Sequence, residues 1–112
     1  MAYDEQLAEE VRERLLVAAE GELTEKRMFG GLGFMVDGNL TIAASRTGGL
    51  LVRTDPADAD EVLALEGVEP MENRGRKMPG WVFVEADVLR DEESLDDWVE
   101  RSLTFVATLP PK

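Results

Sequence analysis

Residues 26–39 read Lys26-Arg-Met-Phe-Gly-Gly-Leu-Gly-Phe-Met-Val-Asp-Gly-Asn39. The last three residues, Asp37-Gly38-Asn39, separate two apolar runs, which is a strong signal for a β-hairpin. Gly48 and Gly49 mark a second turn, and another apolar run follows them. We therefore predict three antiparallel strands, at residues 34–36, 40–42 and 50–53.

Helices are predicted on both sides of these strands. Apolar residues recur at helical spacing after Asp4 until Gly21 offers a stop. Asp55 can accept hydrogen bonds from free backbone N–H groups, and Pro56 suits a first helical position. Ser94 opens a sequence that fits a capping box, and a pair of prolines ends the apolar period that follows. We predict three helices, over residues 4–21, 55–67 and 94–109.

Two further strands, at 68–71 and 81–84, are predicted between the second and third helices. A long connection containing glycine and proline, residues 72–80, joins them. The resulting order is α-β-β-β-α-β-β-α. This order is typical of a two-layer α+β fold with an antiparallel sheet.

Three glycines at positions 30, 31 and 33 raise the question of a phosphate-binding loop. A dinucleotide or phosphate loop needs a strand before the glycines and a helix after them, whereas here a strand and a hairpin follow. We therefore interpret Gly30 and Gly31 as residues that permit a positive φ or a bulge where the chain turns into the strand. A nest of backbone N–H groups that binds a small anion beside Arg27 stays open as the alternative.

Aromatic residues and acid clusters also have structural explanations. Asp91-Glu-Glu93 and Asp96-Asp97 lack the spacing of a calcium loop, and acids at a helix N-terminus are explained by the helix dipole. Four large aromatic side chains are predicted to pack in the core. They are Trp81, Phe83, Trp98 and Phe105.

Composition excludes most catalytic chemistry. The 112 residues include no histidine and no cysteine, so the chain has no Ser-His or Cys-His nucleophile and no imidazole or thiolate metal ligand. An enzyme would have to rely on carboxylates, lysine, Tyr3 or backbone donors, and no spacing selects a reaction. We therefore predict a protein that is not an enzyme and that has no metal and no cofactor.

Charge is divided unevenly along the chain, although the net formal charge is −12. Residues 26–53 carry four basic residues and one acid, and residues 73–84 carry three basic residues and no acid, while the helical segments are strongly acidic. Either the arginines pair with acids on a solvated surface, or one basic face of the sheet contacts an anion or an acidic partner. The candidate contact residues are Lys26, Arg27, Gly30, Gly31, Arg53, Arg74, Arg76 and Lys77.

The N-terminal residues are acidic, and no apolar run approaches the roughly 20 residues that span a bilayer. We therefore expect no signal peptide, no membrane contact and a soluble cytoplasmic protein. Since 112 residues suffice for one modest core, we expect one domain over residues 1–112. The strong negative charge makes direct nucleic-acid binding unlikely.

Several of these motifs, taken in order, resemble the N-terminal domain of the TfoX/Sxy family. They are Tyr3-Asp-Glu before the first helix, the stretch 26–39 with its Arg-Met-Phe-Gly-Gly element, Leu50-Leu-Val-Arg53, residues 75–84, Trp98-Val99 and the ending Leu109-Pro-Pro-Lys112. The resemblance covers nearly the whole chain, as expected of a stand-alone short member. It implies a two-layer α+β fold like that of type III secretion chaperones.

The resemblance also implies a function and carries over no catalytic residue. In the better-known members this domain is joined to a C-terminal domain, and the full protein promotes competence gene expression together with the cyclic-AMP receptor protein. We therefore expect a binding or regulatory module, a transcription or competence-related adaptor that acts through protein contacts. A small-ligand or anion-binding protein that uses the glycine turn is the alternative. Homodimerisation through the edge of the sheet is a further expectation.

Overall fold

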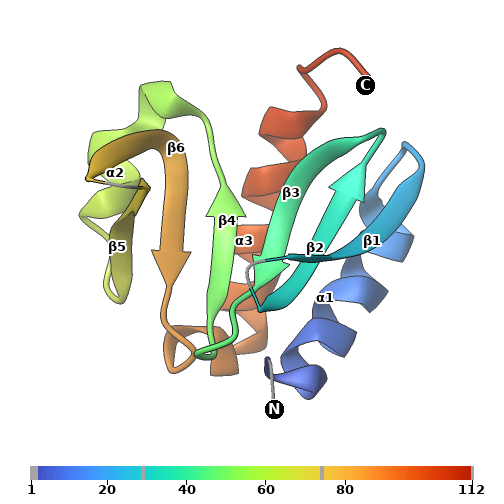
Figure 1. The fold of residues 1–112 in the computed structure, drawn as a ribbon, viewed down its shortest axis with the longest axis horizontal. Helices are drawn as coiled ribbons and strands as arrows, with labels where there is room; N and C mark the ends of the chain where they lie inside the picture. Colours follow the sequence, from blue (N-terminus) through green and yellow to red (C-terminus); the bar gives the residue numbers. More distant parts are fainter. Residues whose placement is uncertain (1–2, 29, 74, 112) are drawn as a thin grey trace.

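A computed structural model describes residues 3–28, 30–73 and 75–111 of the chain (Figure 1). Two short 3-10 helices, Pro56–Asp58 and Val88–Arg90, accompany the main elements. In chain order, the main elements are α1 (Glu5–Ala18), β1 (Leu23–Met28), β2 (Gly31–Val36), β3 (Asn39–Ala44), β4 (Leu50–Arg53), α2 (Ala59–Leu63), β5 (Val68–Asn73), β6 (Arg76–Val84) and α3 (Glu92–Val106).

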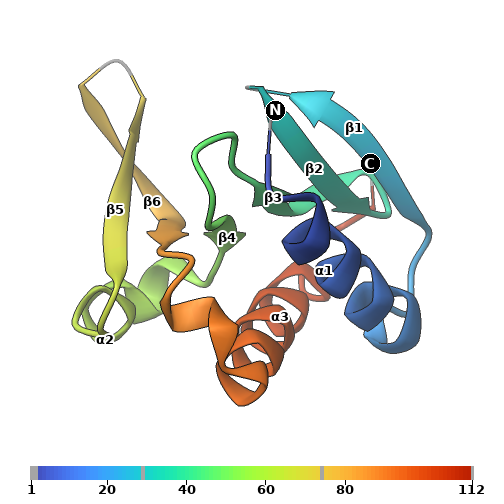
Figure 2. The ribbon, with the colours of Figure 1, turned by 90° about the horizontal axis from the view of Figure 1, so that it is seen from below.

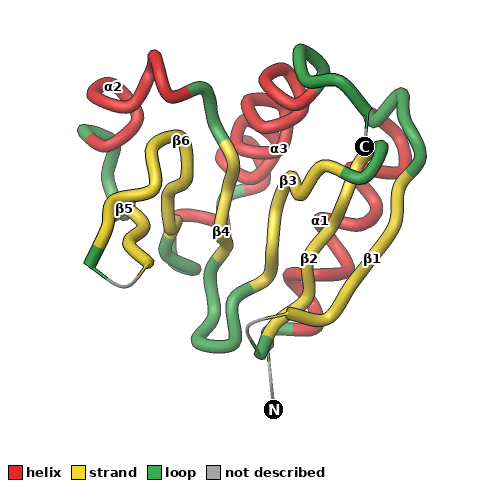
Figure 3. Tube along the Cα trace, turned by 45° about the horizontal axis from the view of Figure 1, so that its top comes forward, coloured by secondary structure: helices red, strands yellow, loops and turns green. Residues whose placement is uncertain are grey.

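The six strands of the described chain form one antiparallel sheet in the order β1-β2-β3-β4-β6-β5. Helices α1 and α3 lie side by side against one face of this sheet, and the β1–β2 and β5–β6 hairpins curve away from them (Figure 2). The other face carries no helix (Figure 3). The predicted two-layer α+β fold with an antiparallel sheet is therefore confirmed.

The core lies between the sheet and the two long helices. Phe34, Ile42 and Val52 are fully buried on neighbouring strands, and α1 and α3 pack on them through residues such as Leu15 and Trp98. Burying apolar area of this kind is the main favourable term in folding. Because successive side chains of a strand point to opposite faces of the sheet, core side chains alternate with side chains on the other face.

Buried polar groups tie the C-terminal part of the chain to β3. The Ser102 hydroxyl donates a hydrogen bond of 2.9 Å to the Thr41 carbonyl oxygen. The Asn39 side-chain amide donates to the carbonyl oxygen of Pro110 at 3.0 Å. Since a buried polar group without a partner is costly, these bonds fix α3 and the segment after it against the sheet.

One strand was not predicted. Strand β1 has the sequence Leu-Thr-Glu-Lys-Arg-Met, and its four central residues are exposed. Because it forms an edge of the sheet and carries charged side chains, it lacks the apolar alternation that identifies a strand from sequence. The observed order therefore has four strands, not three, between the first and second helices.

The predicted connection over 72–80 is also different in the structure. Strands β5 and β6 extend through most of that segment and pair as far as Asn73 and Arg76. Gly75 has a φ of +79°, which suits a tight turn. The segment is therefore a long hairpin, not an irregular loop.

The predicted starts at Asp4 and Asp55 agree with the structure, whereas the helices themselves are shorter than predicted and the third begins earlier. Helix α1 ends at Ala18, and the segment predicted as a helix over 55–67 contains a 3-10 turn followed by the short helix α2 (Ala59–Leu63). The Asp4 carboxylate accepts from the Leu7 backbone N–H at 3.1 Å, and Asp55 caps the 3-10 turn before α2. Helix α3 begins earlier than Ser94, because Asp91 is its N-cap and accepts from the Glu93 N–H at 3.1 Å. Asp91 therefore caps α3, and Glu92 and Glu93 lie in its first turn, where negative charge is favourable.

None of the helices in the described part of the chain is both long enough and apolar enough to cross a bilayer.

Candidate protein-binding face of the sheet

The sheet face that no helix covers carries a band of half-buried apolar side chains. Register places them there, because each is opposite another member or alternates with a core residue along its strand. We call this side of the sheet the uncovered face. Its apolar residues are Met28, Met35, Leu40, Leu51, Trp81 and Phe83.

A hollow of about 310 Å³ lies in the uncovered face. It reaches from β1 to β5 and includes the loop between β3 and β4. Its lining consists of Met28, Ala43, Ala44, Ser45, Arg46, Thr47, Leu51, Met71 and Phe83. Flexible methionine side chains at two of its sides can adapt to different apolar groups.

The arginines of the helices and the cations of the sheet differ in their ion pairing. The helical arginines pair with acids, as Arg12 does with Glu25 at 2.6 Å and Arg101 with Glu61 at 3.8 Å. Five cations of the sheet and its loops take part in none of the ion pairs found among the described residues: Lys26, Arg27, Arg46, Arg53 and Arg76. The interpretation that all arginines pair with the acids therefore holds for the helices only.

The predicted contact residues of β1 lie on different faces. Lys26 is opposite Gly33 in the ladder and points to the uncovered face. Arg27 is opposite the core residue Leu32 and points to the side of the helices. Both side chains are exposed, and Lys26 is the one that can contact a ligand on the uncovered face.

Arg53, whose position in β4 also faces the uncovered side, contacts two aromatic rings and a backbone carbonyl. Its guanidinium carbon lies 5.5 Å from the Trp81 ring centroid and 5.8 Å from that of Phe105. One of its nitrogens donates to the Leu40 carbonyl oxygen at 3.3 Å, where β3 and β4 have ceased to pair. These contacts connect the end of β4 with β6 and α3. The core prediction is correct for Trp98 and wrong for Trp81, Phe83 and Phe105, which are half-buried.

The basic residues of the β5–β6 hairpin are four strand positions away from β1, or about 19 Å along a sheet. Arg76 is exposed at the start of β6. Arg74 lies outside the described residues, and for Lys77 the structure describes the backbone position opposite Glu72. The two basic segments therefore lie on strands toward opposite edges of the sheet and do not form one cluster.

The glycines of the turn have packing roles. Gly30 has a φ of +75°, and a Cβ there would lie 2.8 Å from the Arg46 Cδ. A Cβ on Gly31 would overlap the carbonyl oxygen of Ala44 on the neighbouring strand. These contacts support the interpretation that the glycines allow a sharp turn and close strand packing.

None of the predicted contact residues is among the described residues that line the hollow, and Arg46 is a basic residue of the hollow that the sequence did not indicate. It lies in the β3–β4 loop, and among the described lining residues it is the charged one. Its side chain passes over the turn at Gly30, which brings a guanidinium next to an apolar surface. A single arginine between two strands gives no periodic signal, so its position depends on the tertiary fold.

The link between α1 and β1 perturbs the pKa of one carboxylate. The Arg12 guanidinium donates two hydrogen bonds to Glu25, at 2.6 and 2.8 Å, and this pairing lowers the pKa of the Glu25 carboxyl. The same bonds raise the pKa of Arg12. The pair fixes the edge strand to the helix layer and leaves the uncovered face free.

These features define a small two-layer α+β domain with one sheet face covered by helices and the other face open. The chain belongs to the TfoX N-terminal domain family, whose model matches residues 15–106. No curated protein and no solved structure gives a significant match. The resemblance seen in the sequence is therefore confirmed at the level of the family.

Proposed function

We propose that this TfoX-type domain is a non-enzymatic regulatory module that binds a protein partner on the uncovered face of its sheet. The observation that carries the proposal is the hollow, with its apolar side chains from five strands and one guanidinium without an ion-pair partner among the described residues. An exposed apolar surface bordered by polar groups is typical of an interaction site.

The chemistry of the hollow specifies the partner segment. Leu51 and Phe83 form an apolar floor, and Arg46 lies at the rim. A segment with one or two bulky apolar side chains beside a carboxylate satisfies both, because Arg binds a carboxylate through two parallel hydrogen bonds. Lys26 adds positive charge to the uncovered face at the β1 edge of the sheet.

By analogy with the better-known members of the TfoX family, the proposed partner belongs to the transcription machinery and the domain acts as an adaptor. A net charge of −12 opposes direct contact with nucleic acid, since phosphate backbones repel such a protein unless its cations are gathered on one face. The basic segments lie on strands toward opposite edges of the sheet and are not gathered in one cluster, which favours contact with a protein.

The test places a photoreactive amino acid at Leu51, inside the hollow, in the tagged full-length chain in its own cells. The control places it at Leu16, which is 65% exposed on α1 and is not among the residues that line the hollow. We expect a crosslinked protein at position 51 that is absent at position 16 and survives nuclease. Arg46→Glu should reduce its yield at least about fivefold.

Several outcomes contradict the proposal. Identical products at positions 51 and 16 would show non-specific contact. A product lost on nuclease treatment would identify nucleic acid as the ligand, and a product consisting of this chain alone would identify a homodimer. Background at both positions would remove the uncovered face as a binding site.

A further inference from the structure

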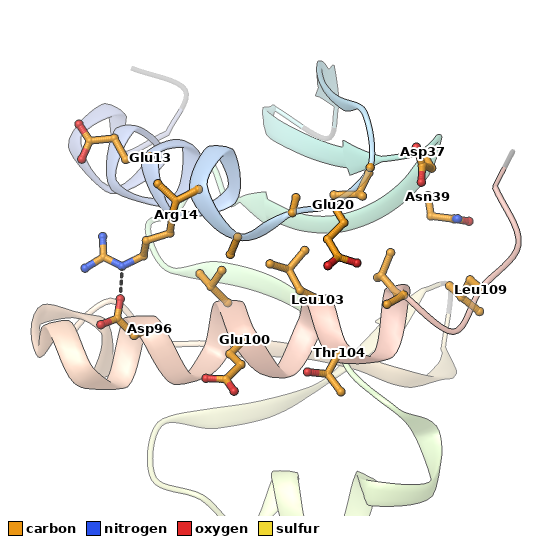
Figure 4. A pocket seen from close by; sticks show the side chains of 18 residues that line it. Glu13, Arg14, Glu20, Asp37, Asn39, Asp96, Glu100, Leu103, Thr104 and Leu109 are labelled. Carbon is orange, nitrogen blue, oxygen red and sulfur yellow. Dashed lines mark hydrogen bonds and ion pairs between the residues drawn. The ribbon is translucent and has the colours of Figure 1, made fainter.

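A second and larger groove lies on the helical side of the molecule, away from the uncovered face (Figure 4). It has a volume of about 870 Å³, within the range of ligand sites. The C-terminal half of α1 and the loop after it form one wall, and α3 forms the other. The β2–β3 turn closes one end.

The floor of this groove is apolar. Val36, Val99 and Val106 belong to the buried side chains beneath it, and Leu103 points from α3 toward the end of α1. Val17 also lines the groove and is 89% exposed. Apolar contact area is therefore available to a ligand along the groove.

The walls of the groove are strongly acidic. Its described lining contains five carboxylates and one guanidinium, and that guanidinium, on Arg14, is already paired with Asp96. Asp37 is also engaged, because it accepts from the Glu22 N–H at 2.9 Å. Glu20 and Glu100 are exposed, and the Glu20 carboxylate points toward α3. A positively charged ligand is the one that this surface attracts.

The walls also specify the form of the ligand. The described lining comes mainly from helices, a loop and the β2–β3 turn, and its strand residues Val36 and Asn39 pair with each other, so it offers no continuous strand edge to an extended peptide. A helix satisfies its own backbone hydrogen bonds and can insert one apolar stripe between two parallel ridges of side chains. Lysine or arginine on its flanks would then lie near Glu20 and Glu100.

We infer that this groove, lying between α1 and α3, binds a basic amphipathic helix of a protein partner. This inference does not depend on the proposed function, because it uses the opposite side of the molecule. Together the two surfaces would let one small domain hold two segments of opposite charge. That capacity is what an adaptor requires.

The test uses a fluorescent synthetic peptide of about five helical turns with leucines at i, i+3, i+4 and i+7 and lysines elsewhere. Binding to the full-length chain is measured by fluorescence anisotropy at about 50 and 300 mM salt. We expect saturable binding that weakens with salt. A peptide of the same composition in scrambled order should bind at least about tenfold more weakly, because it lacks the apolar stripe.

A matched pair of variants separates the groove from net charge. Glu20→Lys with Glu100→Lys reverses two exposed groove acids, and Glu66→Lys with Glu72→Lys makes the same charge change at exposed positions outside the groove. We expect about a tenfold loss of affinity for the first variant and less than about twofold for the second. Thermal melting confirms that both remain folded.

The inference is overturned if the two variants lose affinity equally, or if the scrambled peptide binds as tightly as the amphipathic one. Absence of saturable binding to the wild-type chain also overturns it. None of these results bears on crosslinking at Leu51.

Discussion

Replacing Gly31 with alanine is expected to destabilise the protein by about 2 kcal/mol, whereas the same change at Gly33 should cost less than about 1 kcal/mol. Both glycines lie on β2 with their α-carbons facing the uncovered side, two residues apart. They differ in what a new methyl group would meet. The pair therefore isolates one physical variable, the ability of the neighbour to move.

The magnitude follows from the neighbouring atoms. At Gly31 the methyl group would overlap the backbone carbonyl oxygen of Ala44, which can move only if β2 and β3 separate. Overpacking of this kind costs about 1–3 kcal/mol, and the stiffer unfolded chain returns about 0.4–1 kcal/mol. At Gly33 the methyl group would lie 2.9 Å from the ends of the Met28 and Leu40 side chains. Those side-chain ends can rotate away, so the smaller packing cost is nearly offset by the gain from the stiffer unfolded chain.

Urea unfolding followed by far-UV circular dichroism measures both changes. For Gly31→Ala we expect a lower midpoint at unchanged slope and a Tm reduced by about 8 °C, since 1 kcal/mol corresponds to about 4 °C or more in a domain of this size. The reasoning is refuted if Gly31→Ala stays within about 0.5 kcal/mol of the wild type. It is also refuted if Gly33→Ala is equally destabilising.

Two further predictions test the ion pair between Arg12 and Glu25 and the N-cap of α3. The Glu25 carboxylate has a lowered pKa in the folded state, so its contribution is present above the unfolded pKa of about 4 and is lost as pH falls through the folded value. Glu25→Gln should therefore lower the free energy of unfolding by about 0.5–1 kcal/mol at pH 7 and by almost nothing in strong acid. Urea unfolding at the two pH values measures this difference. Equal losses at both pH values would contradict the role of the Arg12 ion pair. Asp91→Ala should lower the free energy of unfolding by about 1 kcal/mol, because it removes the N-cap of α3, and Ser94→Ala should lower it less. A larger loss for Ser94→Ala would support the capping box predicted at Ser94 and contradict Asp91 as the cap.

The sequence was sufficient for the elements whose pattern is set by burial. The Asp37-Gly38-Asn39 turn lies between β2 and β3, and Asp37 has a φ of +51° that this hairpin requires. Helix α1 was found from its apolar period, because Val11 and Leu15 contact the core. Strand β1 was missed because its pairing, not its side chains, holds it in the sheet.

The site was less predictable, since it depends on which segments meet. Lys26 and Arg27 are neighbours in sequence and were grouped together, but the pleat of β1 points them to opposite faces. Met28, Leu51 and Met71 line one hollow although they are far apart along the chain. No periodicity within a single segment could have shown this convergence.

The order of the strands also bears on how the chain reaches this structure. In the described chain, four of the strand pairings join sequence neighbours, and the β4–β6 pairing is the one that passes over intervening elements. Neighbouring strands close short loops, which form in microseconds and cost little chain entropy. The contact between Arg14 and Asp96 joins residues 82 positions apart. We therefore expect the hairpins to form early and the docking of α3 beside α1 to be the late step that sets the folding rate.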